Sequence, residues 1–134
     1  MQMRQPAAKQ GDQIVADDIH TVLVPAGAGE APVQVVHRFN GTIVDIVSSN
    51  VKIMGSPAAT VDSVATDKDH LKPPPGSRFP KPPANRGKVT KGSSSVFINK
   101  QPAARHGDVA ETCGDPADTT VGTVVVTAGT VWIG

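Results

Sequence analysis

The fold is decided by residues 93–113, which read SSSVFINKQPAARHGDVAETC. This stretch predicts a short β-strand over residues 96–98, a tight Pro102-Ala-Ala segment, a corner at Gly107-Asp108, and then the only cysteine of the chain. Proline fixes φ, the two alanines permit close packing, and glycine adopts backbone conformations closed to residues with a β-carbon. The aspartate of the corner is expected to cap the turn through backbone hydrogen bonds. The stretch therefore predicts a strand followed by a compact turn.

The same plan recurs twice upstream. Shifted by 45 positions, residues 48–65 align with residues 93–110 without a gap, and nine of the eighteen residues are identical. A weaker copy starts at Pro6-Ala7-Ala8, with Asp12 in the capping position. Repeats of one supersecondary unit bury their apolar faces against one another. We therefore expect a single domain over residues 1–134, with repeat copies near residues 5–24, 48–70 and 93–115.

Composition predicts an all-β protein with a thin core. The 134 residues include 13 Gly and 12 Pro, which disfavour helix interiors, and the only aromatic side chains are three Phe and one Trp. A domain with a thin core usually needs a cross-link. Because a single cysteine cannot form an internal disulfide, a bound metal is the next candidate for that cross-link.

Two further segments complete the expected organisation. Residues 33–40 alternate between apolar and polar, which places His37 on the apolar face of a strand. Asn40-Gly41 predicts a two-residue hairpin turn, with a return strand over residues 42–47. Residues 67–92 hold six of the twelve prolines and seven of the thirteen Lys and Arg residues. This composition predicts a long, basic, Pro-rich surface loop.

Charge and motif content exclude several classes of protein. The net charge of +1 argues against a nucleic-acid-binding surface spread over the whole protein. The amino terminus lacks an apolar signal core, and no apolar run approaches the ~20 residues of a membrane-spanning helix. We therefore expect a chain made in the cytoplasm without a signal peptide, which leaves the cell as cargo or as part of a machine. Common hydrolase and phosphate-binding motifs are missing, so we do not expect an enzyme.

Three possible metal ligands occupy matched positions in the repeats. Counted from the proline of each Pro-Ala-Ala segment, His20 lies at +14, His70 at +13 and Cys113 at +11. Three units of one shape would bring these side chains to a common place, and His37 could supply a fourth ligand. Imidazole nitrogen and thiolate sulfur are the donors that tetrahedral Zn²⁺ prefers. The sequence therefore predicts one structural zinc ion per chain, held by His20, His37, His70 and Cys113.

Each of these residues also has a simpler interpretation. His37 could be a core histidine with a satisfied hydrogen bond, His20 a solvated turn residue, and His70 part of a loop surface. Cys113 could be a buried, inert thiol. The matched repeat positions favour the joint metal site over these separate explanations. His106 is interpreted as a surface residue, because its counterparts in the other copies bind metal poorly.

The repeats resemble a known family. Pro102-Ala-Ala-Arg105 followed by Gly107-Asp108, with further Pro-Ala-Ala segments at Pro6 and Pro57, is similar to the PAAR-repeat family. The resemblance implies a small β-cone of pseudo-threefold design, found at the spike tip of type VI secretion systems and phage-like contractile injection particles. It implies that the broad base caps a trimeric β-helical spike of the VgrG or phage-hub type, with one cone per trimer.

The resemblance also implies that the sharp end pierces the target envelope and holds zinc near the tip with three histidines and one cysteine. Carried over by position, these are the four ligands named above. We accordingly expect a non-enzymatic spike tip whose contact with the target membrane is transient. The base is expected to dock through strand ends and apolar side chains, with Trp132 and Phe97 as contacts.

Two alternative functions stay open at this point. A zinc hydrolase would need three protein ligands, an open position for an activated water molecule, and a general base, for which Glu111 is the only nearby candidate. An adaptor would present the basic loop to an effector carried on the spike.

Overall fold

The computed structural model describes residues 4–67, 72–114 and 117–134, and this part of the chain forms strands and turns without a helix. It accordingly offers no helix that could cross a membrane. The all-β class expected from composition is confirmed. The strands are β1 (Gln5–Pro6), β2 (Gln13–Ala26), β3 (Gly29–Asp45), β4 (Lys52–Ile53), β5 (Ser56–Pro57), β6 (Val64–Thr66), β7 (Arg86–Val89), β8 (Phe97–Ile98), β9 (Gln101–Pro102), β10 (Val109–Thr112), β11 (Thr119–Val125) and β12 (Trp132–Ile133).

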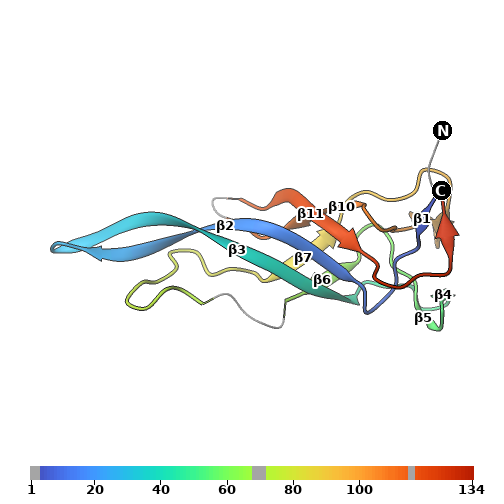
Figure 1. The fold of residues 1–134 in the computed structure, drawn as a ribbon, viewed down its shortest axis with the longest axis horizontal. Coiled ribbons are helices and arrows are strands. Elements are labelled where there is room, and N and C mark those ends of the chain that lie inside the picture. The colour runs from blue at the N-terminus through green and yellow to red at the C-terminus, as the bar shows by residue number, and fades with distance from the viewer. Residues whose placement is uncertain (1–3, 68–71, 115–116) are drawn as a thin grey trace.

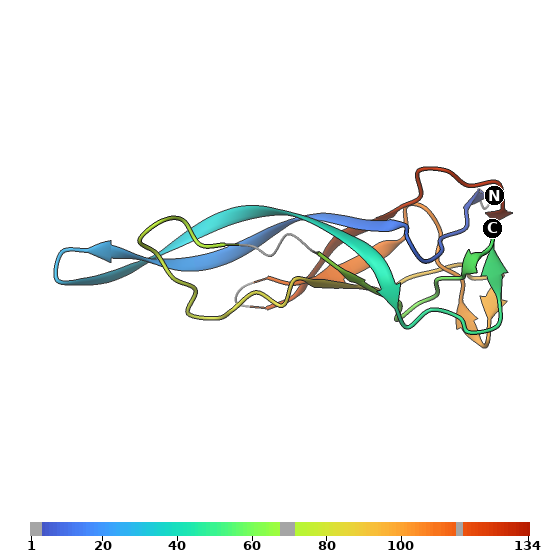
Figure 2. The same ribbon diagram turned by 90° about the horizontal axis from the view of Figure 1, so that it is seen from below.

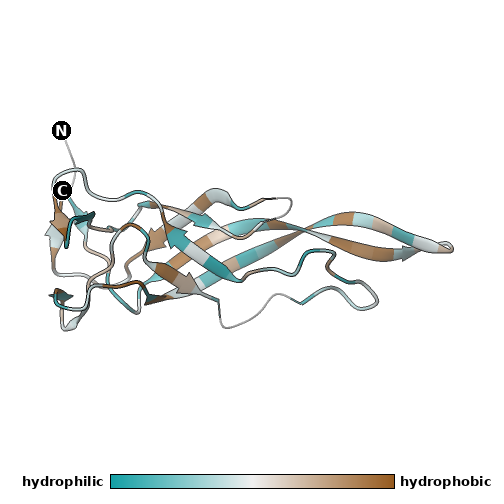
Figure 3. Ribbon diagram, turned by 180° about the vertical axis from the view of Figure 1, so that it is seen from behind, coloured by the Kyte–Doolittle hydropathy of each residue, from teal (hydrophilic) through white to brown (hydrophobic). Residues whose placement is uncertain are grey.

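The molecule is elongated, with a broad and a narrow end (Figures 1 and 2). The short strands β1, β4 and β5 and the C-terminus lie at the broad end, which we call the base. The hairpin β2–β3 runs from the barrel to the narrow end, which we call the tip. The hairpin keeps one register from Gln13↔Thr42 to Ala26↔Gly29. Bands of alternating hydropathy run along it, as expected for a strand pair with one face turned inward (Figure 3).

The three Pro-Ala-Ala turns close into a ring. The Ala8 N–H donates to the Ala104 carbonyl (2.9 Å), the Ala104 N–H to Ala59 (3.1 Å), and the Ala59 N–H back to Ala8 (3.0 Å). All three alanines are fully buried. A cyclic set of three hydrogen bonds is the signature of a pseudo-threefold axis, and small side chains are needed where three backbones meet so closely. The ring explains why the repeats keep the alanine pair.

The first repeat receives its leading strand from the other end of the chain. β4 pairs with β5 and β8 pairs with β9 within their own repeats, whereas β1 pairs with the C-terminal strand β12. As a result Lys52, Phe97 and Trp132 occupy the same position, each opposite a repeat proline. The base therefore presents three equivalent strand pairs.

Above the ring, six strands close into a barrel in the order β10-β11-β2-β3-β6-β7. Each turn of the ring leads into one hairpin of the barrel, so that the three units are β2–β3, β6–β7 and β10–β11. The expected loop over residues 67–92 is therefore interrupted: its last part contains β7, which pairs with both β6 and β10. The prediction of one continuous loop did not include this strand. It was based on proline and lysine content, which identifies a surface connection but does not show where the chain pairs again with the barrel.

The predicted hairpin turn at Asn40-Gly41 is wrong. Both residues lie inside β3, opposite Val15 and Ile14 of β2, and the hairpin turns at residues 27–28 instead. Gly41 is needed because a β-carbon there would lie 2.7 Å from Cζ of Phe39, a fully buried ring in the barrel. The glycine serves close packing and not chain reversal.

Asp12 and Asp108 cap their turns as predicted. Their carboxylates accept the N–H of Lys9 (3.0 Å) and Arg105 (2.7 Å), and the Ser63 hydroxyl accepts the Thr60 N–H (2.9 Å) in the remaining repeat. The three corners thus share one hydrogen-bonding scheme.

The residue before each cap has a positive φ, which is 97° at Gly11, 78° at Asp62 and 89° at Gly107. We expect Gly107→Ala to lower the free energy of unfolding by about 1–2 kcal/mol, since an L side chain is strained in this region. No atom lies within 4 Å of the added β-carbon, so the loss would report backbone strain alone. Urea denaturation measures it. Asp62→Gly is the matched control and should not destabilise; equal stability of Gly107→Ala and the wild type would contradict the assignment.

Candidate metal centre

The barrel brings together buried side chains from two units. Asp18 and His20 lie two residues apart on β2, so both side chains face inward. Cys113 follows directly after β10, the first strand of the third hairpin unit. The three side chains are 1%, 2% and 3% exposed, respectively.

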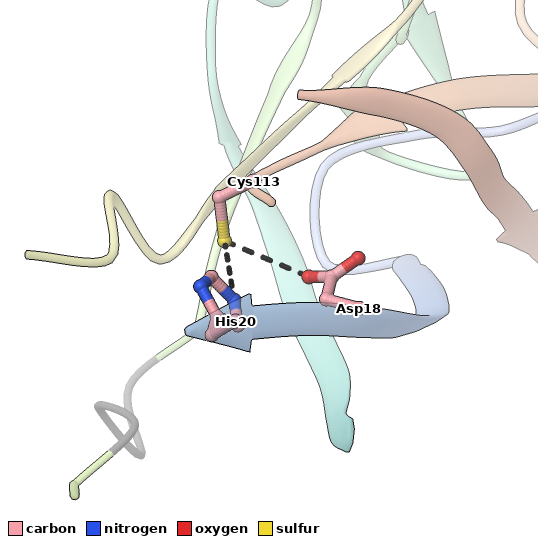
Figure 4. Close-up of side chains that lie close together, drawn as sticks. All are labelled: Asp18, His20 and Cys113. Carbon is pink, nitrogen blue, oxygen red and sulfur yellow. Dashed lines mark hydrogen bonds between the residues drawn. The ribbon is translucent and has the colours of Figure 1, made fainter. Parts of the chain in front are cut away.

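The three side chains form one compact group (Figure 4). Cys113 Sγ lies 3.6 Å from Asp18 Oδ2 and 3.9 Å from His20 Nε2. One ligand atom from each residue lies within 4.8 Å of the other two. Two ligands of one zinc ion lie at most about 4.6 Å apart, because each bond measures roughly 2.0–2.3 Å. Both distances from Cys113 Sγ are below this limit. The group is therefore a candidate metal site with oxygen, nitrogen and sulfur donors.

The acidic groups of the site lie in a poorly hydrated environment. Burial raises the pKa of the Asp18 carboxyl, against the effect of hydrogen bonds from the Thr112 hydroxyl and the Cys113 thiol. Burial also raises the pKa of the Cys113 thiol, and the neighbouring Asp18 carboxylate adds to the shift. A cation between these two groups would favour the charged form of each. The donor set thus fits a metal ion.

His37 lies at the edge of this group. It is the register partner of Asp18 across β2–β3, and its ring centroid lies 6.3 Å from that of His20. Its Nε2 atom is buried, lies 3.5 Å from Asp67 Oδ2, and makes no hydrogen bond within the described residues. A buried nitrogen without a hydrogen bond costs about 1–3 kcal/mol. A buried nitrogen without a hydrogen bond is what a histidine that completes a metal site would show.

Of the four predicted ligands, His20 and Cys113 are brought together and His37 lies beside them. His70 falls within residues 68–71, outside the described residues. Asp18 was missed by the sequence reasoning, which counted only histidine and cysteine. Its spacing of two residues from His20 on a strand was the available signal. His106 lies away from this group and accepts the Val126 N–H through Nδ1 (3.0 Å), so it has a structural contact of its own.

Comparison with known families identifies a motif that includes two of the three Pro-Ala-Ala turns. The sequence pattern of the PAAR motif matches residues 33–117, well over half of the chain. The protein belongs to the PAAR-motif family. The match includes the second and third turns and Cys113, whereas the first turn and its partner β12 are contributed by segments on either side of it. A comparison with individual curated proteins found no match. PAAR-motif proteins are structural, spike-tip-type proteins of type VI secretion-like systems, and this chain is one of that type.

Proposed function

We propose that this PAAR protein is a zinc-stabilised spike tip, which caps a trimeric spike of the VgrG or phage-hub type and pierces the target envelope in a contractile injection system. The observation that carries the proposal is the closed ring of three turns at the base of a PAAR-family chain. One chain with three equivalent faces can meet three identical chains, which a chain without internal repeats could not do symmetrically.

The base has the surface that such docking needs. Phe97 and Trp132 are 57% and 56% exposed and occupy equivalent positions beside Pro102 and Pro6. Exposed large apolar side chains grouped on one face mark a contact with a partner. The edges of the short strands beside them are suited to continuing a β-sheet of the spike. In this arrangement the base faces the spike and the β2–β3 hairpin faces the target.

Zinc would be held by His20, His37, His70 and Cys113, with Asp18 as a neighbouring carboxylate. A structural zinc ion supplies a cross-link among segments that are distant in sequence, and such links can decide folding where the core is small. Here the ligands come from β2, β3, the β6–β7 connection and the end of β10. A metal ion bound to these ligands would link the three hairpin units to one another above the ring of turns.

A hydrolytic function is not favoured by the site. Glu111, the general base considered from the sequence, alternates on β10 with the buried residues Ala110 and Thr112. Its side chain instead lines a separate surface cavity of about 290 Å³ together with Arg86 and Lys88. A general base must come within hydrogen-bond reach of the water that it activates. The proposed role of the metal is therefore structural.

Binding stoichiometry tests the proposed docking. We expect one copy of this protein to co-purify with three chains of the trimeric spike protein of the same particle, as measured by light scattering of the complex. Phe97→Lys combined with Trp132→Lys should weaken binding at least tenfold, because both anchors of the base are lost. The matched control is Val36→Lys, an equally drastic change on the exposed face of the hairpin, which should bind normally. A complex with one tip for each spike chain would refute the proposal.

A further inference from the structure

Residues 77–84 lie along the β2–β3 hairpin (Figures 1 and 2), and we call them the strap. Part of the strap lies beside His20 and Cys113. A turn over residues 74–77 leads into the strap, and β7 follows it after Asn85. The barrel does not need this segment, since six strands already close around the core without it. Its contacts therefore call for an explanation of their own.

The strap is pinned to the hairpin at Arg78. The backbone of Arg78 exchanges two hydrogen bonds with that of Leu23 in β2, at 2.8 and 3.0 Å. The Arg78 guanidinium donates two parallel hydrogen bonds to the Glu30 carboxylate of β3, from Nε to Oε2 (3.0 Å) and from Nη2 to Oε1 (2.9 Å). Bidentate pairing of this kind fixes orientation as well as distance. One residue of the strap thus engages both strands of the hairpin.

Beyond this anchor the strap passes over the metal centre. The Phe79 ring meets the His20 ring edge to face, with centroids 6.3 Å apart. The Lys81 ammonium donates to the carbonyl of Gly114, the residue after Cys113, at 3.3 Å. Pro82 and Pro83 then line a cavity of about 30 Å³ together with His20 and Cys113. This volume admits an ion or a water molecule but not a substrate, for which sites of about 300–1,000 Å³ are usual.

We propose that the strap is a cover of the metal centre, in which Phe79 holds the His20 ring in place and Arg78 keeps the cover closed. Proline suits this role, because Pro80, Pro82 and Pro83 limit the conformations that the open strap could adopt. The strap makes the centre a closed one, so that the metal leaves, and reagents reach Cys113, only when the strap lifts. The statement that the strap controls release of the metal rests on the proposed zinc site. The statement that it controls access to Cys113 does not.

Two rates measured on the purified full-length protein test the cover. The first is release of zinc to a chromogenic chelator, and the second is modification of Cys113, the only thiol, by a disulfide reagent. We expect Arg78→Ala combined with Phe79→Ala to raise both rates about tenfold. Phe79→Tyr should keep the wild-type rates, since it preserves the ring against His20. The matched control is Arg38→Ala, which removes an exposed ion pair between the two strands of the hairpin, with Asp17, and involves no residue of the strap.

The outcomes separate the cover from the zinc proposal. Unchanged rates in the double variant, with circular dichroism showing a folded protein, would overturn the cover. Faster thiol modification in a protein that purifies without zinc would support the cover and refute the zinc site. If the double variant does not fold, Phe79→Leu, which keeps most of the apolar volume but not the ring, should show faster modification of Cys113; wild-type rates in that variant would likewise overturn the cover.

Discussion

Cys113→Ser should lower the melting temperature by at least about 10 °C and remove most of the bound zinc. The replacement changes one buried atom and leaves almost no cavity, so in a metal-free protein it would be nearly neutral. Loss of a thiolate ligand is different, because structural zinc contributes ~10–16 kcal/mol in small zinc-finger peptides near neutral pH. For a chain of this size each kcal/mol shifts the melting temperature by several degrees. Thermal unfolding followed by circular dichroism measures the shift, and elemental analysis should find one zinc per wild-type chain.

His106→Ala is the matched control for Cys113→Ser. It removes a histidine that lies outside the candidate metal centre but accepts one backbone hydrogen bond from Val126. We therefore expect a loss of about 1 kcal/mol and an unchanged zinc content. If His106→Ala were the more damaging of the two, or if X-ray absorption showed a water molecule bound to the metal, the proposed ligand set would be wrong.

The repeats made the base of this fold predictable. Matching flanks around Pro6, Pro57 and Pro102 indicated three equal turns, and the ring of hydrogen bonds at Ala8, Ala59 and Ala104 follows directly from packing three such turns on one axis. Local patterns were poorer guides inside the barrel. Asn40-Gly41 has the composition of a turn, yet the glycine is required because the Phe39 ring leaves no room for a β-carbon. A turn pattern read from two residues does not report this packing.

The candidate metal centre was predictable in part for the same reason. Repeat symmetry relates His20 to Cys113, and the barrel does bring these side chains together. Asp18 obeys no repeat relation, since its nearness to Cys113 depends on how the end of β10 meets β2. The position of the strap along the hairpin could not be predicted from the sequence either. Proline and lysine content predicted a surface segment, but its path depends on tertiary contacts, above all those of Arg78 with Leu23 and Glu30.

Phe39→Ala should cost about 3–5 kcal/mol of unfolding free energy, the usual range for removing a buried phenylalanine. The ring is fully buried in the barrel. A β-carbon added at Gly41, on the same strand β3, would lie 2.7 Å from its atoms, and one added at Gly87 of β7 would lie 3.2 Å away. Two glycines thus leave the space that one ring fills. Val36→Ala on the same strand is the matched control, and with 72% of Val36 exposed it should cost less than about 0.5 kcal/mol.

The same packing predicts that the loss of stability in Gly41→Ala depends on whether the Phe39 ring is present. In the wild type the new methyl group would collide with the Phe39 ring, because β-carbons do not approach other atoms as closely as 2.7 Å, and overpacking of this kind costs about 1–3 kcal/mol. In Phe39→Ala the methyl group would enter the space left by the ring and keep one close contact, 3.1 Å to the Ala65 β-carbon, so that it should be close to neutral. Urea denaturation of the four proteins measures the coupling, expected at about 1 kcal/mol or more, within the range seen for residues in contact (about 0.5–3 kcal/mol). Additive losses would show that β3 needs Gly41 for its backbone geometry and not to admit the ring, and the Phe39 contact would then no longer explain why Asn40-Gly41 lies in a strand.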